Sequence, residues 1–154
     1  MGQTLREPEI KTRKAAADDL GRIEEIERES FPSPWGGEAY EEELALRGSV
    51  LLAAAAGDDM IGFVAARVVM DEGHVIKIAV SGDWRRRGVA GRLMEGLEKE
   101  FMERGVKVIW LEVRSTNRPA RMFYRGLDFH EIAVRRKYYA DTGEDAVVMM
   151  KELE

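Results

Sequence analysis

The residues best placed for chemistry form a short basic and glycine-containing segment, Arg85-Arg86-Arg87-Gly88-Val89-Ala90-Gly91. The hydrophobic pattern around it predicts that it joins the end of a strand to the start of a helix. Amide groups at a helix start have no partner within the helix, and the helix dipole favours negative charge there. The segment lacks the Lys-Ser/Thr pair of a nucleoside-triphosphate loop and the first two glycines of a dinucleotide fingerprint. We therefore expect either a site for a pyrophosphate group without a metal, or a capped surface helix whose glycine allows close packing.

Glu112 and Tyr124 are two further candidates with acid–base chemistry. Glu112 alternates with Trp110 on one face of a predicted strand, which would place its carboxylate in a cleft. Burial would raise the pKa of this carboxylate and nearby arginines would lower it, and the sequence does not decide which effect is larger. Taken alone, both residues also have structural interpretations. Glu112 is then a charged residue at a strand end, and Tyr124 is a core aromatic residue whose hydroxyl reaches the rim.

The elements that must position these residues follow from hydrophobic period and turn signals. The predicted strands cover residues 9–14, 50–56, 60–70, 74–80, 106–113, 129–138 and 146–150, and the predicted helices cover residues 20–29, 38–46, 88–104 and 117–127. Asn117 is expected to cap the last helix. The nearly continuous apolar run at 106–113 predicts a strand covered on both faces. The alternating order predicts a mixed α/β (α+β) fold in one domain, residues 1–154, with strand, basic loop, helix and strand forming a right-handed crossover.

Composition restricts the class of protein. With 154 residues and 45% hydrophobic content, one packed domain is expected, and the absence of cysteine excludes thiol nucleophiles and disulfides. The longest apolar runs are far shorter than the ~20 residues of a membrane span, and no signal peptide is recognisable, so we expect a cytoplasmic protein without a membrane partner. His74 and His130 are isolated and are interpreted as structural, and no cluster has metal-ligand spacing, so no metal is expected.

Charge is distributed unevenly along the chain. The net charge is -5, yet residues 85–137 contain 14 basic and 7 acidic residues. A nucleic-acid-binding domain is usually basic as a whole, so nucleic acid is not expected as a partner. The local excess fits either an anionic ligand or a solvated helix face with salt bridges.

Several motifs in order resemble the GNAT acetyltransferase superfamily over almost the whole chain. They are the Arg-x-x-Gly-x-Ala pattern at Arg85, Gly88 and Ala90, and the segment Trp110-Leu111-Glu112-Val113-Arg114-Ser115-Thr116-Asn117. Phe123-Tyr124-Arg125-Gly126-Leu127-Asp128-Phe129 and Arg135-Arg136-Lys137-Tyr138-Tyr139, followed by Gly143-Glu144-Asp145-Ala146, resemble the RimI-type and archaeal protein N-terminal acetyltransferases. The resemblance implies a single-domain GNAT fold with a mixed, mostly antiparallel twisted sheet of about six to seven strands and about four helices.

The resemblance also implies how the acetyl donor, acetyl-CoA, would bind. Its pyrophosphate would lie over the loop from Arg86 to Gly91. The backbone of Ile78, Ala79 and Val80 would pair with the pantetheine arm and place an N–H near the thioester oxygen. Loss of one such donor typically costs ~3 kcal/mol of transition-state stabilisation. Asn117 would contact the donor as well.

By the same resemblance, Glu112 is the general base and Tyr124 the general acid. An N-terminal ammonium has a pKa near ~8 and must lose a proton before attacking a thioester, and Glu112 would accept that proton directly or through water. Tyr124 would donate to the departing sulfur. The ordinary pKa values of a phenol and a thiol lie within ~1.5 of each other, so we expect this transfer to be nearly balanced.

The acceptor is expected to be a protein or peptide N-terminus, with ribosomal protein alanine N-termini among the candidates, attacked directly in a ternary complex. Tyr138 and Tyr139 would line one wall of the acceptor groove, and Phe31 and Trp35 the opposite wall. The first loop has Pro32-Ser33 and Pro34-Trp35, as RimI-type enzymes do, where archaeal and eukaryotic enzymes often carry Pro-Glu. Two alternatives remain open: acetylation of a small amine or antibiotic, and a non-catalytic acyl-CoA-binding regulator. The basic run Arg135-Arg136-Lys137 would either steer an acidic peptide or form a solvated strand edge. The sequence does not predict the oligomeric state.

Overall fold

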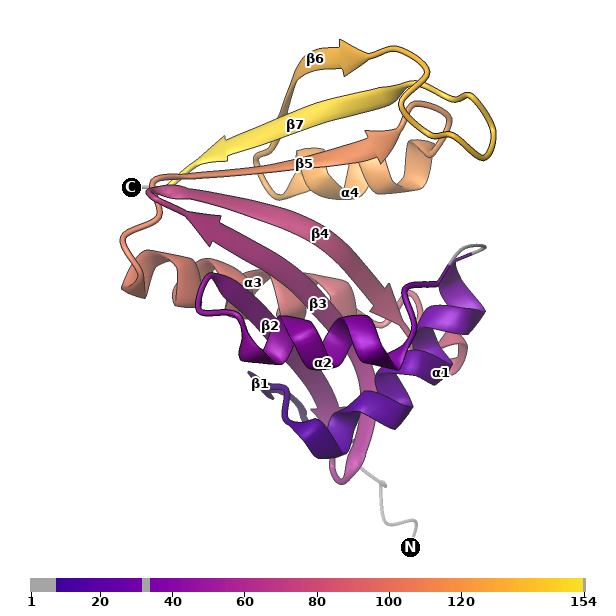
Figure 1. Ribbon diagram of the computed structural model, residues 1–154, viewed down its shortest axis with the longest axis vertical. Coiled ribbons are helices and arrows are strands. Elements are labelled where there is room, and N and C mark those ends of the chain that lie inside the picture. Colours follow the sequence, from indigo (N-terminus) through magenta and orange to yellow (C-terminus); the bar gives the residue numbers. More distant parts are fainter. Residues whose placement is uncertain (1–7, 32–33, 154) are drawn as a thin grey trace, which may run out of the picture. The chain divides into compact units, whose positions relative to one another are not determined.

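The computed structural model describes residues 8–31 and 34–153, and within them it has seven strands, four α-helices and two short 3-10 helices (Figure 1). The strands are β1 (Ile10–Lys14), β2 (Ser49–Ala56), β3 (Asp59–Val69), β4 (Glu72–Val80), β5 (Val108–Arg114), β6 (His130–Arg135) and β7 (Ala146–Glu152). The α-helices are α1 (Leu20–Ser30), α2 (Gly37–Ala45), α3 (Val89–Glu103) and α4 (Arg118–Gly126), and the 3-10 helices are η1 (Ala17–Asp19) and η2 (Gly82–Trp84). Every predicted helix and strand is present, which confirms the expected fold class.

The strands form one hydrogen-bonded sheet in the order β1-β2-β3-β4-β5-β7-β6. β1 is antiparallel to β2, and β7 is antiparallel to both β5 and β6. β4 and β5 are parallel, with His74 opposite Trp110. Parallel neighbours need a long connection, which α3 supplies. The sheet is therefore mixed and mostly antiparallel, as expected.

Two details of the predicted strands are wrong. Burial along β5 alternates, with Ile109, Leu111 and Val113 buried and the intervening residues only partly covered, so the strand is not covered on both faces. β6 ends at Arg135 instead of continuing to residue 138. Lys137 has a positive φ of 51°, and its amide donates to Asp145 Oδ1 at 2.9 Å, so the chain turns where the sequence predicted a strand.

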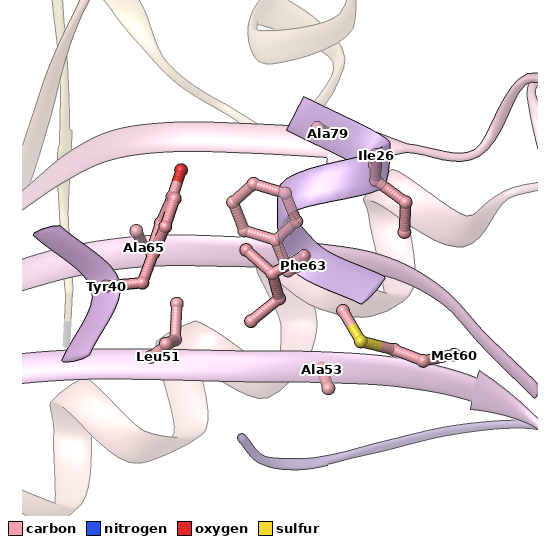
Figure 2. Close-up of a cluster of buried hydrophobic side chains, with 9 residues drawn as sticks. Ile26, Tyr40, Leu51, Ala53, Met60, Phe63, Ala65 and Ala79 are labelled. Atoms are coloured by element: carbon pink, nitrogen blue, oxygen red, sulfur yellow. The ribbon is translucent and has the colours of Figure 1, made fainter. Parts of the chain in front are cut away.

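The chain divides into two compact units, the first comprising the chain up to Ala65 together with Lys77–Glu100. Its core contains aliphatic and aromatic side chains from α1, α2, β2, β3 and β4 (Figure 2), namely Ile23, Ile26, Tyr40, Leu51, Ala53, Met60, Phe63, Ala65 and Ala79. The rings of Tyr40 and Phe63 meet edge to face, with centroids 5.6 Å apart. At Gly62 an added Cβ would lie 3.2 Å from Val89 and 3.3 Å from Leu93, so β3 and α3 approach closely here. These contacts fix the start of α3.

The second unit comprises Ala66–Ile76 and Phe101–Glu154, and of it residues 66–76 and 101–153 are described. Leu111 of β5 lies opposite Met149 of β7, and both are buried. The ring of Tyr124 on α4 meets Phe129 with centroids 5.5 Å apart. None of the helices within the described ranges combines the length and apolar character that crossing a membrane requires.

Candidate functional site

The basic loop of the first unit leads from the end of β4, through η2, into α3. Arg86 and Gly88 have positive φ values of 62° and 80°, and α3 begins directly afterwards at Val89. The amide of Arg92 donates to the carbonyl of Gly88 at 3.1 Å. The amides of Val89, Ala90 and Gly91 precede this bond and belong to the first turn, whose N–H groups have no acceptor within the helix. The predicted strand–loop–helix junction is therefore present.

Gly88 and Gly91 distinguish the two interpretations of this loop. A Cβ added at either glycine would meet no atom within 4 Å, so neither residue is glycine to allow close packing within the chain. Gly88 needs its positive φ, whereas Gly91 is an ordinary helical residue at which glycine is unfavourable by about 0.5–1 kcal/mol relative to alanine. Open space at both positions fits a ligand that approaches the backbone closely.

The three arginines of the loop are exposed. Arg85 Nε donates to the carbonyl of Val80 at 3.2 Å, and the Arg87 guanidinium lies over the Trp84 ring at 5.0 Å. These contacts leave positive charge on the solvent side of the helix start. The loop therefore combines exposed cations with the amide groups of a first helical turn.

The predicted donor-binding strand lies immediately before this loop. Ala79 is buried, whereas Ile78 and Val80 are partly exposed. The amide of Ser81 donates to the carbonyl of Ile61 at 2.8 Å, which fixes the end of β4 to β3. The parallel register of β4 with β5 covers Glu72 to His74 among the described residues, so Ile78–Val80 lie beyond the paired part of that register.

Phe31 and Trp35, the predicted acceptor-groove residues of the first unit, are placed around a lysine of β4. The Lys77 ammonium lies 4.7 Å from the Phe31 ring centroid and 4.5 Å from that of Trp35. The same ammonium donates to Glu27 Oε2 at 2.7 Å. Lys77 could not be recognised as a site residue from the sequence, because its partner Glu27 lies 50 positions away.

In the second unit, Glu112 is held by side chains from two other strands, β4 and β6. Its side chain is 10% exposed, and its Oε2 lies 3.1 Å from His74 Nε2. Its Oε1 lies 3.6 Å from Arg135 Nη1. The His74 ring stacks on Trp110 at 3.7 Å between centroids and 4° between planes. Because Trp110 and Glu112 are on the same face of β5, this stacking directs the imidazole toward the carboxylate.

The structure decides the direction of the pKa shift of Glu112. The hydrogen bond with His74 lowers its pKa and outweighs the opposing effect of desolvation, and the charge of Arg135 and the Tyr138 hydroxyl lower it further. The carboxylate is therefore ionised at neutral pH and can accept a proton. The interpretation of His74 as an isolated histidine is wrong, because its ring contacts the candidate base. No signal in the sequence pairs His74 with Glu112, because the register of β4 with β5 is known only from the structure.

Tyr124 is buried, with 6% of its surface exposed, and burial raises its pKa strongly. It stays protonated at neutral pH and can donate a hydrogen bond. Burial of the phenol therefore disfavours complete transfer of its proton compared with the nearly balanced transfer expected from ordinary pKa values. On the same helix, Asn117 Oδ1 accepts from the amide of Ala120 at 3.2 Å, which confirms the predicted cap. This cap uses the side-chain oxygen and leaves the two amide N–H donors of Asn117 for other partners.

Tyr138 and Tyr139 lie in the loop between β6 and β7, where their rings meet edge to face at 5.1 Å. Arg114, at the end of β5, holds this loop. Its guanidinium lies 4.0 Å from the Tyr139 ring centroid and donates to both carboxylate oxygens of Asp141, at 3.1 and 2.8 Å.

Within the described ranges, no group of three or more His, Asp or Glu side chains is placed to hold a metal ion.

Comparisons of the sequence and of the structure with known proteins all find acetyltransferases. Residues 20–129 match the acetyltransferase (GNAT) family. The chain is 38% identical to a [ribosomal protein bS18]-alanine N-acetyltransferase of Salmonella typhimurium, over 85% of this chain and 89% of the relative. It is 32% identical to an N-alpha-acetyltransferase of Saccharolobus solfataricus, over 92% of each chain. The crystal structure of the ribosomal-protein-S18-alanine N-acetyltransferase from Escherichia coli superposes with a TM-score of 0.87 at 30% identity, covering 95% of both chains.

Proposed function

Because the chain belongs to the acetyltransferase (GNAT) family, we propose that it transfers acetyl from acetyl-CoA to the α-amino group of a protein N-terminus. The names of the relatives from Salmonella typhimurium and Saccharolobus solfataricus support an N-terminal acceptor. A ribosomal protein with an N-terminal alanine is the first acceptor to test, and we propose that the reaction takes place in the cytoplasm. The observation that carries the proposal is the ionised, nearly buried Glu112 held by His74 and Arg135.

We assign donor binding chiefly to the first unit. The open backbone at Gly88 and Gly91 and the exposed Arg85, Arg86 and Arg87 suit a pyrophosphate. The strand end at Ile78, Ala79 and Val80 suits the pantetheine arm, and in the second unit the Asn117 amide is a further donor to it. Acetyl-CoA supplies the activated acetyl group.

We assign proton transfer to the second unit. The acceptor arrives as an ammonium and loses its proton to Glu112, directly or through water. The freed amine forms a C–N bond to the acetyl carbon in a ternary complex, the C–S bond breaks, and the second proton of the attacking nitrogen passes to the sulfur, directly or through water, so that the products are a neutral amide and the CoA thiol. Tyr124 donates a hydrogen bond to the departing sulfur, which stabilises its negative charge without complete transfer of the phenol proton.

We assign acceptor binding to two pairs of aromatic rings, Phe31 and Trp35 in the first unit and Tyr138 and Tyr139 in the second. Each pair is held by a cation from a strand, Lys77 and Arg114 respectively.

The test is acetyl transfer measured by mass spectrometry on a panel of acceptors. It includes a peptide with a free N-terminal alanine, the same peptide with a blocked N-terminus and an internal lysine, and a set of polyamines. We expect acetylation of the free N-terminus alone. Transfer only to polyamines would replace the proposal with a small-amine acetyltransferase. Binding of CoA with no transfer to any acceptor would indicate a regulator.

A further inference from the structure

Lys77 occupies an unusual environment for a lysine in the middle of a strand. Its side chain is 11% exposed, and the carboxylate that it contacts, Glu27, is fully buried. Isolated buried charges are unfavourable, so buried ionised groups are paired and hydrogen-bonded. Here the partner of Lys77 is Glu27 of α1, which lies 50 positions earlier in the chain. The Lys77 ammonium neutralises the charge of the Glu27 carboxylate.

Glu27 is also the acceptor for the loop between α1 and α2. The amide of Gly36 donates to Glu27 Oε1 at 3.1 Å, and the Tyr40 hydroxyl donates to Oε2. Desolvation raises the pKa of Glu27, but the bonds from Lys77, Tyr40 and the amides of Gly36 and Trp35 together outweigh it and lower the pKa. Glu27 therefore remains an anion that binds both the strand cation and the loop backbone.

The Lys77 ammonium binds the same loop through its side chains. With centroid distances of 4.7 Å to Phe31 and 4.5 Å to Trp35, both rings are within the range of cation–π attraction, which strengthens when the cation is desolvated. One ammonium thus contacts two rings and a buried carboxylate. An apolar residue of similar length would fill the space but would leave Glu27 without its counter-charge.

We infer that Lys77 is the positioning residue that fixes the aromatic wall of the acceptor groove, Phe31 and Trp35, against β4. This inference rests on the proposed function for the role of the two rings. Because Lys77 directly precedes Ile78, the proposed donor-binding strand and the aromatic wall share one anchor. Lys77 contributes to acceptor binding through the two rings and takes no part in proton transfer.

Lys77→Met alone would leave a buried, unpaired Glu27 and can prevent folding. The decisive variant is therefore the double change Lys77→Met with Glu27→Gln, which removes both charges and keeps one carbonyl oxygen that accepts from the Tyr40 hydroxyl or from the Gly36 amide. Lys77→Arg retains the cation and serves as the rescue variant. Lys99→Met, on the exposed face of α3, is the matched control for loss of a lysine.

Four quantities are measured on each folded variant: KM and kcat for the N-terminal peptide, CoA affinity by calorimetry, and hydrogen exchange of the Gly36 amide. For the double variant we expect the acceptor KM to rise about tenfold, equivalent to about 1.4 kcal/mol, with kcat and CoA affinity unchanged and faster Gly36 exchange. Lys77→Arg should retain most of the parental KM, and Lys99→Met all of it.

An unchanged acceptor KM in the double variant, or an equal fall in its kcat and CoA affinity, would overturn the inference. Unchanged Gly36 exchange would overturn it as well, and this measurement does not depend on activity. Failure of the parental protein to acetylate any peptide would instead contradict the proposed function, so the two failures are distinguishable.

Discussion

At the scale of single residues, the charges that matter are paired across long stretches of sequence. His74 reaches Glu112 and Lys77 reaches Glu27, over 38 and 50 positions respectively. The candidate base could be recognised from its place in a strand and from the family motif. Its partners could not, because pairing between strands and helices depends on register and packing, which a single sequence does not contain. The sequence therefore singled out Glu112 and Tyr124 as candidate acid–base residues and left the pKa shift of Glu112 undetermined.

Glu112→Gln should lower kcat for the N-terminal peptide by about 100-fold or more, because a positioned general base typically contributes at least that factor. CoA affinity should be unchanged. Tyr124→Phe should lower kcat less, since a phenol with a raised pKa offers a hydrogen bond and little proton transfer. The matched control is Glu131→Gln. It removes a carboxylate that is paired with Arg121, at 2.8 Å, and not with Glu112. Parental kcat in Glu112→Gln would rule out this carboxylate as the base.

The lowered pKa of Glu112 makes a prediction about pH. Since the folded state holds its pKa below the ordinary value of 4.5, the carboxylate is ionised at every higher pH. The rate should then rise with pH through the titration of the acceptor ammonium, near ~8. Carbon-13 NMR of the labelled glutamate side chains, assigned with Glu112→Gln, measures the carboxylate directly. A Glu112 midpoint above 4.5 would contradict the pairing with His74 and Arg135.

At the scale of elements, the identity of each strand and helix follows from the sequence. The residue at which a strand ends, and whether one or both of its faces are buried, do not. The apolar run in β5 resembles a strand buried on both faces, yet Trp110 and Glu112 lie on a partly open face. The predicted strand continues past Arg135 to residue 138, but in the structure the Lys137 amide donates to Asp145 and the Tyr139 amide donates to the Glu144 carbonyl, and the chain turns. Both errors concern positions where tertiary contacts override local pattern.

Gly91→Ala separates helix stability from ligand binding. A Cβ at Gly91 meets no atom within 4 Å, so alanine should stabilise α3 by about 0.5–1 kcal/mol. The same Cβ would occupy the space assigned to the pyrophosphate, so CoA affinity should fall. Gly21→Ala on α1 is the matched control, because its added Cβ also meets no atom. Calorimetry and thermal unfolding measure the two effects. A stabilised Gly91→Ala with parental CoA affinity would exclude close approach of a ligand at this turn.

Arg114→Met tests the loop between β6 and β7. Loss of the contacts with Asp141 and the Tyr139 ring should free this loop, in which the Tyr139 amide donates to the Glu144 carbonyl at 3.1 Å. We expect faster hydrogen exchange at Tyr139 and a several-fold higher KM for the peptide. Arg125→Met, which removes a more exposed arginine paired with Glu131, should change neither. Parental exchange at Tyr139 in Arg114→Met would show that the loop is held by its own backbone bonds.

At the scale of the whole molecule, the fold could be predicted almost completely. The order of elements and the family motifs together specify a mixed sheet with four helices, and the structure has both. The positive segment inside an acidic chain was also visible, and in the structure it includes the exposed arginines before α3. What the sequence did not indicate is the division into two compact units, because such boundaries depend on the distribution of contacts in space.

The charge distribution predicts how the whole protein responds to CoA. The net charge of -5 repels an anion at long range, so binding depends on short-range attraction by the loop before α3. CoA at a concentration of 100 times its Kd should stabilise the protein by about 2.7 kcal/mol, which raises Tm by roughly 5–10 °C for a chain of this size.

Pantetheine, which lacks the pyrophosphate, should raise Tm much less at equal concentration. Salt should reduce the rise with CoA, because the Debye length falls from about 10 Å at 0.1 M to about 3 Å at 1 M. Equal rises with the two ligands would show that the pyrophosphate adds nothing to binding, and the role assigned to the Arg85–Gly91 loop would then have to be abandoned.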